Sequence, residues 1–199
     1  MPGYSQTLDK LMAVLGKLPG IGPRSAERIA FHLLKAEDAE AFALADAIRD
    51  VKTKIRPCAT CFNIAEAELC EICADPRRDK SIICIVEQPK DLLALESTGA
   101  YQGVYHVLMG HVAPLEGVEP EDLTIGPLVA RIKAGGVQEI ILATNPDISG
   151  DSTALHVAEA LKATDVKISR LARGLPAGGA IEYARRSVLT DAINERRRL

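Results

Sequence analysis

Aromatic side chains are scarce in this sequence. Its 199 residues include no tryptophan, three phenylalanines and four tyrosines. Proteins that hold single-stranded nucleic acid stack successive bases on aromatic rings, so an extended stacking surface is not expected here. Long apolar runs are absent as well, and none reaches the roughly 18 residues of a membrane helix. The first ten residues, MPGYSQTLDK, show neither the basic nor the apolar region of a secretion signal. We therefore expect a soluble, cytoplasmic protein.

A phosphate-binding loop of the type G-x-x-x-x-G-K-[ST] is also missing, so the use of ATP is not expected. The net charge is −3, but acidic residues are unevenly spread. Residues 1–57 hold nine lysines and arginines against seven acidic residues, and residues 174–199 hold five against three. The stretch between them holds ten against seventeen. The two ends can therefore bind phosphate locally although the whole chain is acidic.

The first 56 residues are predicted to be helical. Apolar residues recur three and four positions apart, which is the period of a helix with one buried face. They are Leu8, Leu11, Met12 and Leu15 in a first helix, and Ile29, Ala30, Leu33 and Leu34 in a second. A third helix is expected at about residues 37–54, where acidic residues come early and basic residues late, as the helix dipole favours.

A tight turn joins the first two helices in the segment LPGIGPRSAERIA. Gly20 and Gly22 permit backbone angles that other residues resist, and Pro23 suits the first helical turn, where no amide donor is needed. The free amide groups of the turn and of the helix start then point the same way and form a seat for an anion. The segment closely resembles the helix-hairpin-helix motif, which binds the DNA backbone without reading bases.

Four basic residues surround this turn. Arg24 and Arg28 lie four positions apart, Lys35 follows seven positions later, and these three share one helical face. Lys17 precedes the turn. Together they can neutralise neighbouring phosphates, a contact that carries no sequence information. The alternative is a turn between two core helices, with arginines that are merely solvated.

Four of the five cysteines form two C-x2-C pairs in CATCFNIAEAELCEIC, namely Cys58 with Cys61 and Cys70 with Cys73. Two such pairs complete a tetrahedron of thiolates around zinc at about 2.3 Å. The eight residues between the pairs are fewer than the usual 15–20, which affects the shape of the loop more than the feasibility of the site. Two disulfides are the alternative, and a reducing compartment disfavours them. Four thiolates leave no open position, so we expect structural zinc.

The remaining candidates for metal or acid–base chemistry are interpreted as structural. Cys84 lies inside an apolar strand. His32 and His156 fall in predicted helices and His106 in a predicted strand, and none has a neighbour in the sequence that would orient it.

From residue 81 onwards, apolar β-branched runs alternate with helical stretches. The predicted strands are 81–86, 103–110, 137–144 and 166–172, and the predicted helices between them are 89–98, 125–134 and 151–163. This alternation indicates βαβ crossovers and a mostly parallel sheet, hence an α/β fold that follows a small all-α region. The glycine-rich segment 174–179 then leads into a final helix at about 180–198.

Carboxylates follow two of these strands. Glu87 comes directly after the first strand, and Asp147 and Asp151 lie in NPDISGD after the third. The carboxyl ends of parallel strands are where ligands bind, so these groups can converge. The region resembles the Toprim domain, in which a glutamate and a later D-x-D hold magnesium for phosphoryl transfer. Asn145 stands at the first aspartate position, which weakens magnesium binding. Ordinary strand-end residues or an acidic protein-binding face are the alternatives.

The order of these segments resembles the RecR family of bacterial recombination mediators over essentially the whole chain. The segments that carry the resemblance are LPGIGPRSAERIAFHLL, CATCFNIAEAELCEIC, YHVLMGHVAPLEGVEPEDL, ILATNPDISGDSTA and RGLPAGGAIEYA. One departure is Met109, which stands before Gly110 where a small residue or glycine is expected.

The resemblance implies four regions: a helix-hairpin-helix region at 1–56, a four-cysteine zinc finger at 57–80, a Toprim domain at 81–172 and a C-terminal turn and helix at 173–199. It implies a homotetrameric ring that clamps DNA without catalysing a reaction. The DNA-binding residues it implies are Lys17, Gly20, Gly22, Arg24 and Arg28. It further implies binding to RecO and RecF, and help in loading RecA during repair. The alternative is a magnesium-dependent phosphoryl-transfer enzyme with Glu87, Asp147 and Asp151 as ligands.

Overall fold

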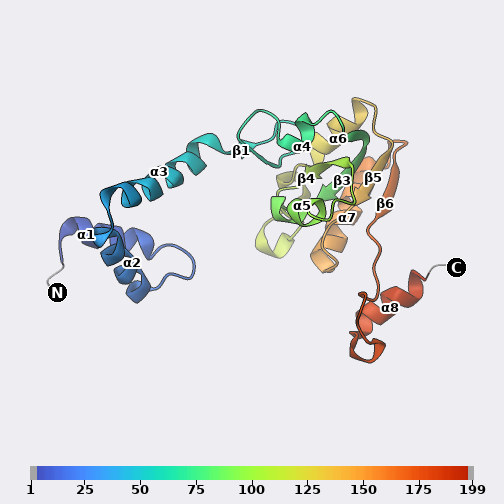
Figure 1. Ribbon diagram of the computed structural model, residues 1–199. Helices are drawn as coiled ribbons and strands as arrows, with labels where there is room; N and C mark the ends of the chain where they lie inside the picture. The colour runs from blue at the N-terminus through green and yellow to red at the C-terminus, as the bar shows by residue number, and fades with distance from the viewer. Residues whose placement is uncertain (1–3, 197–199) are drawn as a thin grey trace. The chain divides into compact units, whose positions relative to one another are not determined.

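A computed structural model describes residues 4–196 of the chain (Figure 1). The chain forms two compact units, with the division after Ile55. Within the described residues, no helix is both long and apolar enough to cross a membrane.

The N-terminal unit consists of three helices, as the sequence predicts. They are α1 (Gln6–Leu15), α2 (Pro23–Lys35) and α3 (Asp38–Lys54). The Ser5 hydroxyl caps α1 by accepting a hydrogen bond from the Leu8 amide at 3.2 Å. Helices α1 and α2 pack side by side, and the fully buried residues on α2 are the small Ala26 and Ala30. Leu34, expected in the buried face, is instead exposed.

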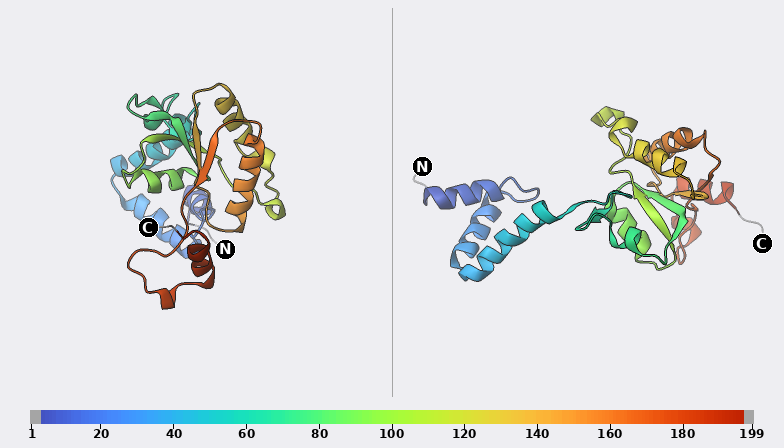
Figure 2. Two further views of the ribbon diagram at one scale, coloured as in Figure 1. Left: turned by 90° about the vertical axis from the view of Figure 1, so that its right-hand side faces the viewer. Right: turned by 90° about the horizontal axis from the view of Figure 1, so that it is seen from above.

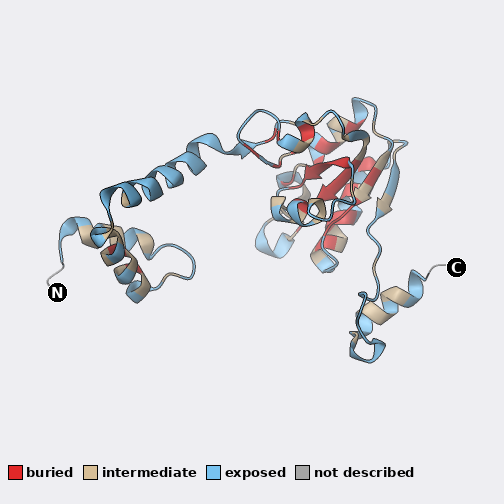
Figure 3. Cartoon of the chain, viewed as in Figure 1, coloured by how far each residue is buried: buried red, intermediate tan, exposed pale blue. Residues whose placement is uncertain are grey.

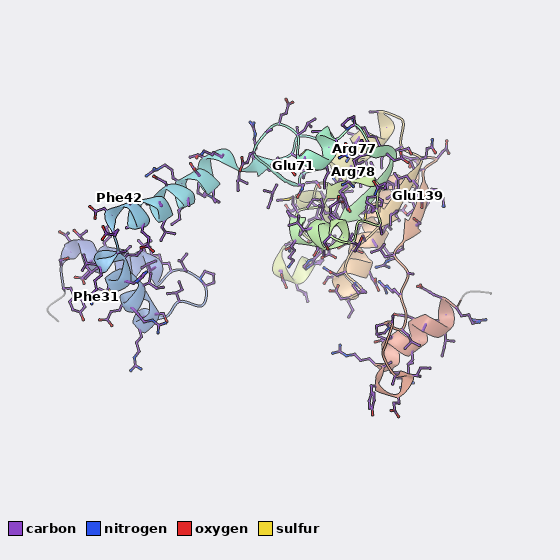
Figure 4. All side chains as sticks on the ribbon, viewed as in Figure 1. Phe31, Phe42, Glu71, Arg77, Arg78 and Glu139 are labelled. Carbon is purple, nitrogen blue, oxygen red and sulfur yellow. The ribbon has the colours of Figure 1, made fainter. Side chains whose placement is uncertain are left out.

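Helix α3 differs from its neighbours because none of its 17 residues is buried. Its large apolar side chains, Phe42, Leu44, Ile48 and Val51, are all exposed to solvent (Figures 3 and 4). Most of the stability of a protein helix comes from burying an apolar face, so α3 lacks its usual source of stability within this chain.

The second unit begins with a small module and continues into the predicted parallel sheet. In the module, β1 (Arg56–Pro57) pairs antiparallel with β2 (Ile64–Ala65), and a short α4 (Glu71–Ala74) follows. The sheet has four parallel strands in the order β4-β3-β5-β6. The strands are β3 (Asp79–Val86), β4 (Gly103–Val107), β5 (Glu139–Leu142) and β6 (Lys167–Arg170), and the helices between them are α5 (Pro89–Glu96), α6 (Ile125–Lys133) and α7 (Ile148–Leu161).

Side chains of β3 point alternately to the two faces of the sheet, and both faces are covered (Figures 2 and 3). Ile83 and Ile85 pack in a core that includes residues of α6 and α7. Cys84 and Val86 pack on the other side with Leu92 of α5. Cys84 is therefore a core residue, as predicted. Burial on both faces explains why this strand is a continuous apolar run in the sequence.

Several predicted boundaries differ from the structure. The strand expected at 103–110 ends at Val107, because the backbone turns at Met109, whose φ is +66°. The helix expected at 180–198 begins only at Arg186, as α8 (Arg186–Asn194). The single turn of 3-10 helix at Ile181–Tyr183 is followed by extended backbone at Arg185, which interrupts helical hydrogen bonding. The last residues of the predicted helix lie outside the described residues.

The connection between β4 and α6 contains two short 3-10 turns, η1 (Pro114–Glu116) and η2 (Pro120–Asp122). Helix α7 begins at Ile148, three residues before the predicted start, because Asp147 caps it: its side chain accepts a hydrogen bond from the Gly150 amide at 2.8 Å.

The strained residue Met109 gives a first prediction. A left-handed conformation costs a non-glycine residue about 1–2 kcal/mol, part of which glycine loses again through its larger unfolded-state entropy. Met109 is half exposed, so little packing is lost when its side chain is removed. Met109→Gly should therefore raise the unfolding free energy by up to about 1 kcal/mol, or the melting temperature by about 2–4 °C.

Phe62 provides the matched control because its φ is also left-handed, at +63°. Its ring, however, packs edge-on against His106, with 5.4 Å between the ring centroids. Phe62→Gly should lower the melting temperature measured by circular dichroism. A fall with Met109→Gly as well would show that the methionine side chain stabilises the turn and that the strain argument is wrong.

Candidate nucleic-acid interface and metal centre

The turn between α1 and α2 is closed by backbone hydrogen bonds. The Ile21 amide donates to the Leu18 carbonyl at 3.1 Å, and Gly20 adopts the left-handed φ of +79° that only glycine takes without strain. Gly22 has an ordinary φ of −84° and serves as the N-cap of α2, so the prediction of unusual backbone angles holds for Gly20 and not for Gly22. Pro23 occupies the first helical turn, as predicted.

The basic residues around the turn are exposed. Arg24, Arg28 and Lys35 lie on α2, and Lys17 follows the end of α1. Among the hydrogen bonds and ion pairs of residues 4–196, none involves the side chains of Lys17, Arg24 or Arg28. Their charges are therefore not compensated within the described part of the chain, and they are available to an anionic ligand.

The two C-x2-C pairs form a single cluster. The sulfur atoms of the four cysteines all lie within 4.8 Å of one another, and all four residues are buried. They are Cys58, Cys61, Cys70 and Cys73. Tetrahedral zinc with bonds of about 2.3 Å separates its sulfur ligands by about 3.8 Å, and the Cys61 and Cys70 sulfurs are 3.5 Å apart. The Cys70 amide lies 3.3 Å from the Cys58 sulfur and donates to it. The residues present thus fit a zinc ion.

The four thiols affect one another's ionisation. Hydrogen bonds from Cys61 and Cys73 hold the pKa of the Cys70 thiol well below its ordinary value, while the hydrogen bond with Cys70 raises the pKa of Cys61. A zinc ion bound by all four thiolates has a structural role, because no coordination position is left open.

The cysteine module is attached to the edge strand of the sheet. The Val107 amide of β4 donates to the Cys61 carbonyl at 2.8 Å, and Phe62 packs against His106 on the same strand. After α4, Arg78 forms an ion pair with Glu96 of α5. The module therefore covers the backbone of β4 that would otherwise be an open sheet edge.

His106 is fully buried beneath this contact, in agreement with its predicted structural role. Its Nε2 lies 3.0 Å from the Thr124 carbonyl oxygen, which can only accept, so Nε2 carries the proton of the neutral ring. Burial lowers the pKa of His106 to about 4, so the ring is uncharged at neutral pH.

Glu87, the carboxylate after β3, is nearly inaccessible and hydrogen-bonded on both oxygens. Oε1 accepts from the Asn145 backbone amide at 2.8 Å, and Oε2 accepts from the Asn145 side-chain amide at 2.6 Å. His111 Nδ1 lies 3.5 Å from the same Oε2. The asparagine that replaces the expected aspartate is therefore a hydrogen-bond donor that satisfies Glu87.

The two aspartates have other partners. Asp147 caps α7, as described above. Asp151 forms ion pairs with both Arg170 and Arg173, and these guanidinium groups, Arg173 foremost, hold the pKa of Asp151 below its ordinary value. Within residues 4–196, the cysteine cluster is the only group of three or more histidine, cysteine or acidic side chains close enough to share a metal ion.

Sequence reasoning missed several members of this region. Arg170 is the last residue of β6, Arg173 follows that strand, and His111 lies in the loop after β4, so no local spacing links them to the carboxylates. Gly150 is the one local signal in the sequence that could have indicated how closely α7 approaches Asn145. A Cβ atom there would lie 2.1 Å from the Asn145 carbonyl oxygen, so only glycine lets the first turn of α7 approach Asn145 this closely.

Three segments of the chain match known protein families. Residues 8–52 match the RecR helix-hairpin-helix family, residues 55–75 match the RecR zinc finger domain with four cysteine ligands, and residues 81–172 match the Toprim domain.

Curated relatives cover the full length. The chain is 50% identical to Recombination protein RecR of Rhodopirellula baltica and 51% identical to that of Rubrobacter xylanophilus, each over all of both chains. It is 52% identical to Recombination protein RecR of Chloroflexus aurantiacus, over 96% of this chain and 93% of the relative.

Metal removal tests the cysteine cluster. The purified protein should contain one zinc ion per chain, and Cys70→Ser should lose it. Without metal the module loses its core, so the Val107 amide should exchange with solvent at least about fivefold faster, as expected when a hydrogen bond of about 1 kcal/mol is lost. Exchange at Ile140, in the centre of the sheet, should change much less.

Cys84→Ala is the control because Cys84 lies outside the cluster. It should keep one zinc ion per chain, measured by mass spectrometry under native conditions. Retention of zinc by Cys70→Ser, or unchanged Val107 exchange after chelation, would contradict a structural metal at this position.

Proposed function

Because the chain belongs to the RecR family of recombination proteins, we propose that it is a non-enzymatic DNA clamp that helps to load RecA. Family membership assigns it a role in recombination repair. Within that role we propose that it acts with RecO and RecF, in the cytoplasm at the nucleoid. The observation that carries the proposal is the set of uncompensated cations, Lys17, Arg24 and Arg28, around a hairpin with free amide groups.

The hairpin is suited to DNA backbone and not to base sequence. Arg24 and Arg28 project from one face of α2, close to the Gly20–Gly22 turn and to Lys17. Such cations each neutralise a phosphate and release its counterions, which makes binding strong at low salt. Sequence-independent binding is what a mediator that acts at many sites requires.

The carboxylates support a non-enzymatic role. Each carboxylate expected to bind magnesium is already paired: Glu87 with Asn145, Asp147 with the α7 backbone and Asp151 with two arginines. Only Asp151 has its charge offset by cations, while Glu87 and Asp147 keep their charge but use oxygen atoms in hydrogen bonds that a bound cation would replace. A magnesium-dependent phosphoryl-transfer enzyme, the competing hypothesis, would have to break these contacts first. We propose that the acidic face instead binds a partner protein such as RecO or RecF.

Exposed apolar side chains support a homo-oligomer. Helix α3 buries no residue in its own chain, although Phe42, Ile48 and Val51 would stabilise it if covered. Near the other end of the chain, Ile181 and Tyr183 are also largely exposed. Two separate apolar surfaces allow each copy to contact two neighbours, and this closes a ring. We propose the tetrameric ring on these grounds.

The proposed division into regions is 1–56, 57–80, 81–172 and 173–199. The boundary between the two compact units, after Ile55, supports the first of these limits. The family match that begins at residue 81 and ends at 172 supports the limits of the Toprim region.

Salt dependence of DNA binding tests the hairpin. The logarithm of the binding constant falls with the logarithm of salt concentration by about 0.9 for each phosphate neutralised on duplex DNA. Arg24→Ala combined with Arg28→Ala should reduce this slope by about two for each copy that contacts DNA. Fluorescence anisotropy with a labelled duplex at several salt concentrations measures it.

Lys133→Ala combined with Lys162→Ala is the control, since it removes the same charge from exposed positions on α6 and at the end of α7. This variant should keep the wild-type slope. An unchanged slope in the arginine variant, at unchanged oligomeric mass, would refute the hairpin as the DNA contact.

Restoring the aspartate tests the carboxylates. In Asn145→Asp, two carboxylates face each other within hydrogen-bond distance in place of a donor and an acceptor, so a divalent cation should bind there. At a magnesium concentration ten times the dissociation constant, the gain in stability is about 1.4 kcal/mol, or about 3–5 °C in melting temperature.

Asn145→Ala removes the donor without adding charge, so it should not respond to magnesium. The wild type should not respond either. Equal stabilisation of the wild type and of Asn145→Asp by magnesium would instead favour the enzyme hypothesis, and nuclease and primer-synthesis assays would then decide it.

A further inference from the structure

A cavity of about 500 Å³ lies beside the hairpin, within the N-terminal unit. Sites for small molecules usually have volumes of about 300–1,000 Å³. The residues that shape it are Tyr4, Met12, Ala13, Lys17, Arg24 and Glu27. Tyr4 precedes α1, Met12 and Ala13 lie on α1, Lys17 lies in the turn after it, and Arg24 and Glu27 lie in the first two turns of α2.

The lining combines apolar walls with charge at one side. Met12 and Ala13 provide apolar surface, and Lys17 and Arg24 bring two cations against the one carboxylate of Glu27, which leaves a net positive charge. Tyr4 is held in place at the cavity: its hydroxyl donates to Glu27 Oε1 at 2.7 Å, and its ring meets Phe31 edge-on at 4.9 Å. An aromatic ring fixed before binding loses little conformational entropy when a ligand arrives.

We propose that this cavity binds the base of one unpaired nucleotide, with its phosphate held by Lys17 and Arg24. A nucleotide has the same combination of properties as the cavity: a flat, largely apolar ring attached to an anionic group. The inference rests on the proposed DNA-binding function and adds to it a preference for DNA structure.

The scarcity of aromatic residues limits the site to one base. Binding of successive bases requires a series of aromatic platforms. In the described part of the N-terminal unit, the other phenylalanine, tyrosine or tryptophan residues are Phe31 and Phe42, and neither lines the cavity. A single base beside a hairpin that grips the backbone is the geometry of a junction between duplex and single strand. Continuous duplex has no free base to offer unless one is extruded from the stack.

Two gapped duplexes test the proposal, identical except that the first unpaired nucleotide carries a base in one and is abasic in the other. The wild type should bind the intact DNA about five- to 100-fold more tightly, the range expected for stacking of one base on an aromatic side chain. Ala13→Leu fills the cavity with a good helix former at an exposed position. It should reduce the ratio to about one and leave the affinity for continuous duplex unchanged.

Variants at Tyr4 separate stacking from folding. Tyr4→Phe keeps the ring and loses only the hydrogen bond to Glu27, so it should keep most of the ratio. Tyr4→Ala should lose it. Ala160→Leu, which places the same leucine at an exposed position near the end of α7, is the control and should bind both DNAs as the wild type does.

The outcomes distinguish this inference from the proposed function. A wild-type ratio near one, or a ratio that survives Ala13→Leu, would overturn the nucleotide site while DNA binding through the hairpin stands. A change in oligomeric mass on Ala13→Leu, with the ratio retained, would also overturn it and would assign the cavity to a second copy of the chain. If the hairpin does not contact DNA, a separate measurement shows it: the salt dependence of DNA binding is then unchanged when Arg24 and Arg28 are both replaced by alanine.

Discussion

The start of the second unit depends on the close grouping of the sulfur atoms of Cys58, Cys61, Cys70 and Cys73. Between Arg56 and Ala74 the buried apolar side chains are the four cysteines and Ala65, with Ile72 packed against them. So few side chains cannot offset the conformational entropy of ordering the segment, and the metal must supply the difference. Once ordered, the segment places the Cys61 carbonyl and the Phe62 ring on β4. A metal site thereby fixes both the module and the adjoining sheet edge.

At the carboxyl ends of β3 and β5, one change of functional group alters the chemistry of the fold. An aspartate at position 145 would share a cation with Glu87, whereas Asn145 donates two hydrogen bonds to it. The result links β3 to the loop after β5 without any ion. Gly150 makes this possible by allowing α7 to begin against the Asn145 carbonyl. The parallel sheet is retained, while its usual ligand-binding edge has become an internal connection.

Local patterns in the sequence predicted the elements whose determinants are local. The apolar run at 81–86, the cysteine spacing and the proline after Gly22 each specify their structure within a few residues. The partners of Asp151 could not be predicted, because Arg170 and Arg173 reach it from a different strand end. Leu34 and Phe42 fit an apolar helical period yet are exposed. Periodicity shows that a face is apolar but does not show whether the covering partner belongs to the same chain. Met109 departs from the small residue expected at its position, and its positive φ explains that expectation.

The bare surface of α3 has a consequence for how much of this protein a cell must hold. In the homo-oligomer proposed above, a helix that buries nothing in its own chain would be ordered by contact with other copies, so its stability would follow mass action and increase with protomer concentration. Dilution would then act on α3 as a denaturant does, without any change of temperature or solvent. Copy number, as well as sequence, would set the fraction of molecules in which the N-terminal unit is fully formed.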